Sequence, residues 1–195
     1  SEGAGAVVAA RAGKNLKKTT LELGGSDAFI VLDDADLDKA VRHAVSGRMG
    51  NSGQACTASK RIIVVDALAD RFLEKFQAAM AGFKPGDPMD KQTTLAPLSS
   101  SQALDTLLGQ VDEAVSQGAR VLLGGKRIAG ERGAFMQPTI LTDIGADQNV
   151  GYVNVLGIAP LDRRNVVWEQ MVADNNWNQQ FFVGEFTNAV ATDNA

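Results

Sequence analysis

Residues 28–65 have the sequence AFIVLDDADLDKAVRHAVSGRMGNSGQACTASKRIIVV, in which two short apolar runs flank an amphipathic one. The flanking runs, 28–32 and 61–65, are rich in β-branched and aromatic residues and predict strands. Between them, apolar residues recur at i, i+3, i+4 spacing from Leu37 to Val45, which predicts a helix. A strand, a helix and a second strand in succession indicate an α/β unit with parallel strands.

The same alternation continues along the chain. Apolar stripes predict helices over 68–83, closed by Pro85-Gly86, and over 104–115, closed by Gly118. Cap candidates are Asp33, Asp34 and Asp36 before the first helix and the serines at 99–101 before the last. Further β-rich runs lie at 19–23, 120–123 and 139–141. The predicted fold class is therefore α/β, a twisted and mostly parallel sheet flanked by helices, with strand 29–32 buried on both faces.

Composition narrows the class of protein. The chain has 195 residues, 45% hydrophobic and 22% charged, which allows one domain or one domain with an appendage. Its net charge of -4 excludes a basic nucleic-acid footprint, and no apolar run approaches the roughly 20 residues that span a bilayer. A single cysteine excludes internal disulfides and predicts a reducing, cytoplasmic location. A single histidine excludes a His-rich metal site, and we expect no metal.

The last 51 residues differ from the rest. Residues 1–144 hold 17 of the 19 basic and 17 of the 23 acidic side chains, so the net negative charge comes from 145–195. The periodicity is also clear only up to residue 144. We therefore predict a domain over 1–144 and expect 145–195 to continue that domain.

Cys56 ends a loop of small and polar residues, 50–57, between the predicted helix and the strand 61–65. Such loops can present a side chain on a rigid frame. A thiolate is a strong nucleophile, although an unperturbed thiol has a pKa of about 8.5 and is mostly neutral at neutral pH. Composition alone favours the alternative, a buried cysteine that packs as a small hydrophobe.

Glu22 is the second candidate, because it lies between two leucines at the end of the run 19–23 and precedes Gly24-Gly25. Burial would make such a carboxylate more basic, and two glycines let a ligand or another segment approach the backbone. The alternative, a strand end with Glu22 on the solvated side, is favoured when the motif is taken singly.

Together the two motifs resemble the signature motifs of the aldehyde dehydrogenase superfamily. Leu-Glu-Leu-Gly-Gly (21–25) precedes Gly-Gln-Ala-Cys (53–56), with the cysteine 34 residues after the glutamate. Segments 26–37, 86–88 with 95–98, 124–125 and 135–141 are also similar to family segments. The resemblance covers about 1–144 and is nearest to bacterial semialdehyde dehydrogenases of the succinate-semialdehyde type.

The resemblance implies a role for each matching residue. Cys56 would attack the aldehyde, hydride would pass to NAD or NADP, and Glu22 would activate the water that hydrolyses the resulting thioester. Ser1, Leu23 and Asn154 would lie at the cofactor. The partners implied are a small-molecule aldehyde and identical chains in a homo-oligomer, with no nucleic acid and no membrane.

Two departures from the family weaken this interpretation. The chain is less than half the length of a complete member, and most of the dinucleotide-binding domain would lie upstream of residue 1. Asn154 stands where the family has a glutamate that holds a cofactor ribose, and an amide cannot accept two hydroxyl hydrogen bonds as a carboxylate does. Two other functions therefore stay open, a catalytically silent structural fragment and a cysteine-dependent esterase or thioesterase.

Two further residues have weaker claims to function. His43 lies on the predicted helix, where a surface or boundary position is favoured over a catalytic one. Arg48 could bind the distal carboxylate of a semialdehyde acid. A solvated arginine at the helix end is the favoured interpretation.

Overall fold

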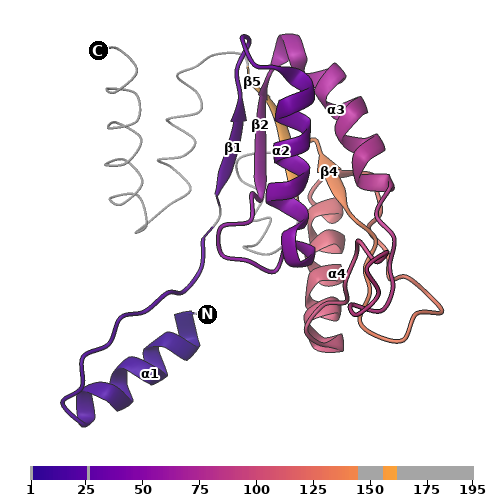
Figure 1. Cartoon of the computed structure of the whole chain (residues 1–195). Coiled ribbons are helices and arrows are strands. Elements are labelled where there is room, and N and C mark those ends of the chain that lie inside the picture. The colour runs from indigo at the N-terminus through magenta and orange to yellow at the C-terminus, as the bar shows by residue number, and fades with distance from the viewer. Residues whose placement is uncertain (1, 26, 145–155, 162–195) are drawn as a thin grey trace, which may run out of the picture.

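The computed structural model describes residues 2–25, 27–144 and, as a strand, 156–161 (Figure 1). Its α-helices are α1 (Glu2–Lys14), α2 (Leu37–Met49), α3 (Asp66–Ala81) and α4 (Ser101–Ser116), with a short 3-10 helix, η1 (Gly50–Gly53). Its strands are β1 (Ala28–Val31), β2 (Arg61–Val65), β3 (Arg120–Leu123), β4 (Ile140–Thr142) and β5 (Leu156–Leu161).

The strands form one mixed sheet in the order β1-β2-β5-β4-β3. Neighbours β1 and β2, β2 and β5, and β5 and β4 are parallel, and only the edge strand β3 runs antiparallel to its neighbour. This confirms the mostly parallel sheet. Strand β5 lies in the middle of the sheet although it is the last of the described strands along the sequence, and it falls within 145–195. The boundary at residue 144 stays a prediction.

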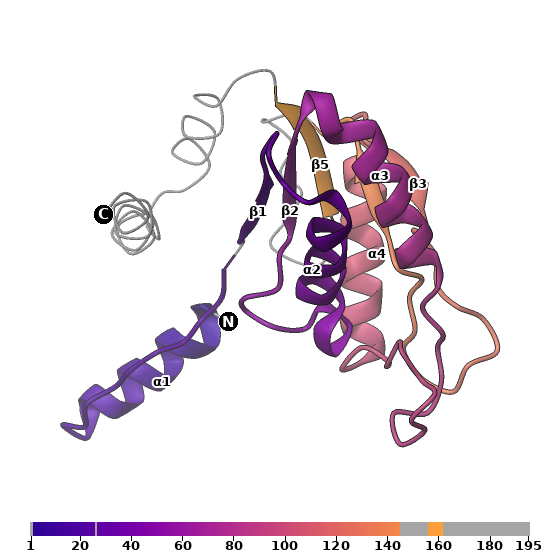
Figure 2. The same cartoon turned by 45° about the horizontal axis from the view of Figure 1, so that its top comes forward.

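Helices cover both faces of the sheet. Successive residues of a strand point to opposite faces, and Ile140 and Leu141 of β4 accordingly join two different apolar clusters. Ile140 packs with residues of α2 and α3, whereas Leu141 packs with residues of α4. Helices α2 and α3 therefore share one face, side by side, and α4 lies on the other (Figure 2).

The larger core lies between β1, β2 and the helix pair α2 and α3. Ile62 and Val64 are two positions apart on β2, so both point into this core, and both are fully buried. On α3, Phe72 and Phe76 are stacked with ring centroids 5.5 Å apart, and both are fully buried. These residues follow the spacing that predicted the strand and the helix, so the core is the one that the sequence pattern indicates.

Two of the predicted caps fix the helix starts. The side chain of Asp36 accepts a hydrogen bond of 3.0 Å from the backbone N–H of Lys39 and begins α2. Ser100 accepts one of 3.0 Å from Ala103 N–H and begins α4. Helix α3 ends at Ala81, before the Pro85-Gly86 pair that was expected to close it.

Three sequence predictions are wrong or incomplete. The run 19–23 forms no strand, because no described strand lies beside it to supply the hydrogen bonds. Helix α1 was not predicted, since its Ala, Gly and Val residues show no clear stripe. The run 29–32 is not buried on both faces. Strand β1 is at the sheet edge, where only Val31 is buried and Leu32 is 40% exposed.

Among the described residues, none of the helices has the length and apolar character needed to cross a bilayer.

Candidate active site

Cys56 lies in the loop that joins α2 to β2. After Met49 the chain turns through η1, where Asn51, Ser52 and Gly53 all have positive φ angles, between 52° and 78°. This left-handed turn redirects the backbone and leaves Cys56 exposed. The buried cysteine favoured by composition alone is therefore wrong. The thiol is presented to solvent, as a nucleophile must be.

Arg48 holds the backbone of this loop through hydrogen bonds. Its guanidinium donates hydrogen bonds to the carbonyl oxygens of Gly53, at 2.9 Å, and Ser59, at 3.3 Å, on either side of Cys56. The side chain is only 3% exposed, so the solvated helix-end arginine is the wrong interpretation. Burial lowers the pKa of Arg48 to about 10, which leaves the guanidinium charged at neutral pH. Gly53 is required here, because a Cβ at this position would run into the Arg48 guanidinium.

Lys60 supports the other end of the loop. Its ammonium donates to the carbonyl oxygens of Gly25, Cys56 and Ala58 at 2.6, 3.3 and 3.4 Å. Burial is the main cause that lowers the pKa of Lys60, and the positive charge of Arg48 adds to it. The charges of Asp27 and Cys56 oppose part of that shift. The backbone N–H of Lys60 donates to Asp27 O at 3.0 Å, which adds a second link to the segment before β1.

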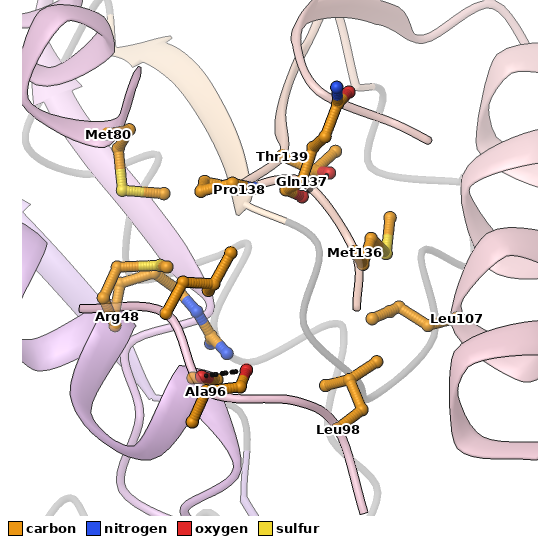
Figure 3. Close-up of a pocket in the computed structure, with 12 residues that line it drawn as sticks. Arg48, Met80, Ala96, Leu98, Leu107, Met136, Gln137, Pro138 and Thr139 are labelled. Carbon is orange, nitrogen blue, oxygen red and sulfur yellow. Dashed lines mark hydrogen bonds between the residues drawn. The ribbon is translucent and has the colours of Figure 1, made fainter. Parts of the chain in front are cut away.

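A third set of contacts ties the loop to the segment before α4. The Ser52 hydroxyl donates to Ala96 O at 2.8 Å, drawn as the dashed line in Figure 3. The Gln54 side chain donates to Pro97 O at 3.4 Å and accepts from Ser99 N–H at 2.9 Å. The loop that carries Cys56 is thus held by hydrogen bonds from Arg48 within the loop, by the link of Lys60 to Gly25, and by contacts with residues 96–99.

Glu22 lies in the irregular segment between α1 and β1, and its side chain is exposed. In the described structure Glu22 is therefore not a carboxylate made more basic by burial, and its role as a base stays a prediction. The end of this segment nevertheless lies at Cys56, since a Cβ built on Gly25 would be 3.4 Å from Cys56 O. The space beside Gly24 is open, with no atom within 4 Å of a Cβ built there.

The predicted cofactor residues are only partly described. The side chain of Leu23 packs against Gly5 of α1, where an added Cβ would collide with it. Ser1 and Asn154 lie outside the described residues. The open space beside Gly24 leaves room for a flat ring at this turn. His43 is exposed on α2, as its surface assignment predicts.

A cavity of about 40 Å3 lies behind the cysteine loop (Figure 3). Arg48 and Ser52 line it on the loop side, and Met80, Leu107 and Met136 line it from the elements around. Neither Cys56 nor Glu22 lines it. At this size it has room for a few water molecules at most. The cavity therefore belongs to the support of the loop and is not where an aldehyde would meet Cys56.

The sequence model of the Aldehyde dehydrogenase family matches residues 1–157, and the chain belongs to that family. The chain is 51% identical over 157 residues to the NADP(+) succinate-semialdehyde dehydrogenase of Deinococcus radiodurans, which covers 80% of this chain and 33% of that protein. It is 50% identical over 141 residues to the NAD(P)+ succinate semialdehyde dehydrogenase Sad of Escherichia coli, with 72% and 30% covered. The chain thus spans about a third of the length of these relatives.

Solved structures of the same family share the fold. Lactaldehyde dehydrogenase from Escherichia coli matches with a TM-score of 0.80 and 35% identity over 86% of this chain and 36% of that one. A 3,6-anhydro-L-galactose dehydrogenase solved in complex with NAP matches with a TM-score of 0.81 and 34% identity, covering 87% and 37%. These matches confirm the α/β fold class.

Proposed function

We propose that this chain carries the nucleophile and the general base of an enzyme that oxidises an aldehyde to its acid with NAD or NADP. The observation that carries the proposal is the position of Cys56. It is exposed on a firmly held loop, and its backbone carbonyl lies against Gly25, three residues after Glu22. Family membership and two succinate-semialdehyde dehydrogenases at about half identity support a semialdehyde as the substrate class.

Covalent chemistry at Cys56 proceeds in two stages. The Cys56 thiolate attacks the aldehyde carbon and forms a thiohemiacetal, with the developing oxyanion beside the backbone N–H of Cys56. A nicotinamide, when bound, would supply the hydride acceptor, and the backbone at Leu23 and Gly24 would be the part of this chain that holds it. Loss of hydride from the thiohemiacetal carbon leaves a thioester on Cys56.

The second stage requires a base. The Glu22 carboxylate takes a proton from water, and the resulting nucleophile attacks the thioester carbonyl. The acid leaves, and Cys56 returns as a thiolate. Exposure of Glu22 in the described residues leaves its carboxylate open to water, which is the substrate of this step.

Cofactor reduction tests this proposal against its alternatives. Succinate semialdehyde with NAD or NADP should give reduced nicotinamide with the unmodified protein and none with Cys56→Ala. A cysteine-dependent esterase would instead turn over p-nitrophenyl acetate without any reaction with the aldehyde. A silent fragment would do neither.

The proposal also includes a cytoplasmic location and a homo-oligomer. An exposed single thiol supports a reducing compartment, because it would otherwise be oxidised or cross-linked. Light scattering of the purified protein measures the assembly directly, and a monomer at all concentrations would contradict the oligomer.

A further inference from the structure

Lys60 is a buried cation whose position has no explanation in the reaction steps above. The residue is 8% exposed, and burial lowers the pKa of its ammonium. Keeping the charged form in this position therefore costs free energy. A methionine of similar length would fill the same space without that cost. The hydrogen bonds that the ammonium makes must therefore account for its presence.

Those hydrogen bonds join two segments that are distant in sequence. The shortest, 2.6 Å, goes to the carbonyl oxygen of Gly25, three residues after Glu22. Another, 3.3 Å, goes to the carbonyl oxygen of Cys56. The backbone of Gly25 also lies against the loop, since a Cβ built there would be in van der Waals contact with Cys56 O, at 3.4 Å.

Arg48 provides a contrast. It is also buried, but its hydrogen bonds to Gly53 and Ser59 close the cysteine loop on itself. Lys60 instead connects that loop to the segment before β1, with its backbone N–H reinforcing the link at Asp27 O. The two cations therefore have different roles. Arg48 shapes the loop, and Lys60 fixes the distance between the loop and the segment that carries Glu22.

We propose that Lys60 is a positioning residue that holds the segment carrying Glu22 against the loop carrying Cys56. The inference rests on the proposed function, because the distance between base and thioester matters only if Glu22 activates water toward Cys56. Attack by Cys56 alone needs no such distance. Loss of the Lys60 ammonium should therefore slow release of an acyl group from Cys56 more than it slows attack by the thiol.

The test uses p-nitrophenyl acetate, which needs no cofactor. Attack of the Cys56 sulfur on the ester forms a thioester and expels p-nitrophenolate, seen as a burst. Water then attacks the thioester, its proton passes to Glu22, and acetate leaves as the thiolate is restored, which sets the steady rate. In Glu22→Gln the burst should stay and the steady rate should fall by about 10²–10⁴-fold.

Lys60→Met should lower the steady rate by about 10- to 100-fold, the size of effect expected from a displacement of about 1 Å. Iodoacetamide alkylation of Cys56, the only thiol, should change far less. In the double variant Glu22→Gln, Lys60→Met, the steady rate should equal that of Glu22→Gln within about twofold, because the base whose position matters is already gone. Lys91→Met, which removes an exposed lysine, is the matched control.

Additive effects in the double variant would overturn the positioning role and leave the proposed function intact. Equal slowing of alkylation and acyl release would also overturn it, because Lys60 would then act on the thiol itself. A Glu22→Gln variant with an unchanged steady rate would instead overturn the proposed base. If Lys60→Met does not fold, Lys60→Gln takes its place, because its amide keeps two N–H donors. The positioning role then again requires that acyl release slows more than alkylation of Cys56 does.

Discussion

Gln54 and Ser99 are joined by a hydrogen bond of 2.9 Å from the backbone N–H of Ser99 to the side-chain oxygen of Gln54. The two residues are 45 positions apart, and the bond links the loop before Cys56 to the start of α4. The same side chain also donates to the carbonyl oxygens of Asn51 and Pro97. A single amide therefore fixes where the cysteine loop meets the helix on the other face of the sheet.

Replacing this amide should loosen the loop and lower stability. Gln54→Met removes both donor and acceptor, and the free energy of unfolding should fall by about 1–2 kcal/mol. Urea unfolding measures the change. Gln92→Met, which alters an exposed side chain, should stay within about 0.5 kcal/mol of the unmodified protein. Equal stability of the two variants would contradict the role of Gln54.

Substitution by alanine should change the stability in opposite directions at two glycines, Gly53 and Gly109. Gly53→Ala places a methyl group against the Arg48 guanidinium at a positive φ of 78°, so it should destabilise the protein by more than about 1 kcal/mol. Gly109→Ala lies in α4 with nothing within 4 Å, so it should stabilise by about 0.5–1 kcal/mol. Thermal unfolding of both variants checks the pair. A tolerated Gly53→Ala would show that the Arg48 contact does not constrain the loop.

The buried ammonium of Lys60 should make the free energy of unfolding depend on pH. Its pKa in the folded protein lies below the usual 10.5, so between the two values the unfolded chain binds more protons than the folded one. The free energy of unfolding therefore rises with pH across that window. The free energy of unfolding of the unmodified protein minus that of Lys60→Met should therefore increase as the pH rises toward 10.5, whichever protein is the more stable at neutral pH. A value of this difference that falls with rising pH would contradict the buried ammonium, and Lys91→Met should show no such trend.

The strands and helices around the cysteine loop could be predicted because their buried residues recur at the spacing of a helix or of a strand. Helix α3 buries Phe72, Phe76 and Met80 at helical spacing, and β2 buries alternate residues. Strand β5 was missed because Gly157 and Pro160 interrupt its run, and such residues weaken a strand prediction. The run 19–23 has strand-forming residues but no described neighbour to pair with, which local sequence cannot reveal.

The site could be predicted only in part. Cys56 and Glu22 stand out because their residue types and neighbours carry chemistry. The contacts of Arg48, Gln54 and Lys60 are mostly with backbone carbonyls, which every residue possesses, so no sequence pattern marks them. Lys60 is close to Cys56 in the chain, but its direction toward Gly25 comes from the parallel pairing of β1 with β2.

Alkylation tests the nucleophile itself. Because Cys56 is the only cysteine, one equivalent of iodoacetamide should add one group per chain and abolish aldehyde oxidation. Bound cofactor should change the rate of labelling, since Cys56 is exposed and its backbone lies against Gly25, in the segment predicted to meet the cofactor. Intact mass and residual activity are measured on the same sample. Activity that survives complete modification would exclude a covalent mechanism at Cys56.

The most direct test of the account is the mass of the Glu22→Gln protein, quenched during the burst with succinate semialdehyde and NADP. With the base removed, thioester hydrolysis should become the slow step, and reduced nicotinamide should appear as a burst close to one per chain. The account predicts one acyl group on the Cys56 peptide, removable by hydroxylamine. An unmodified Cys56 during the burst, or an acyl group on another residue, would contradict it.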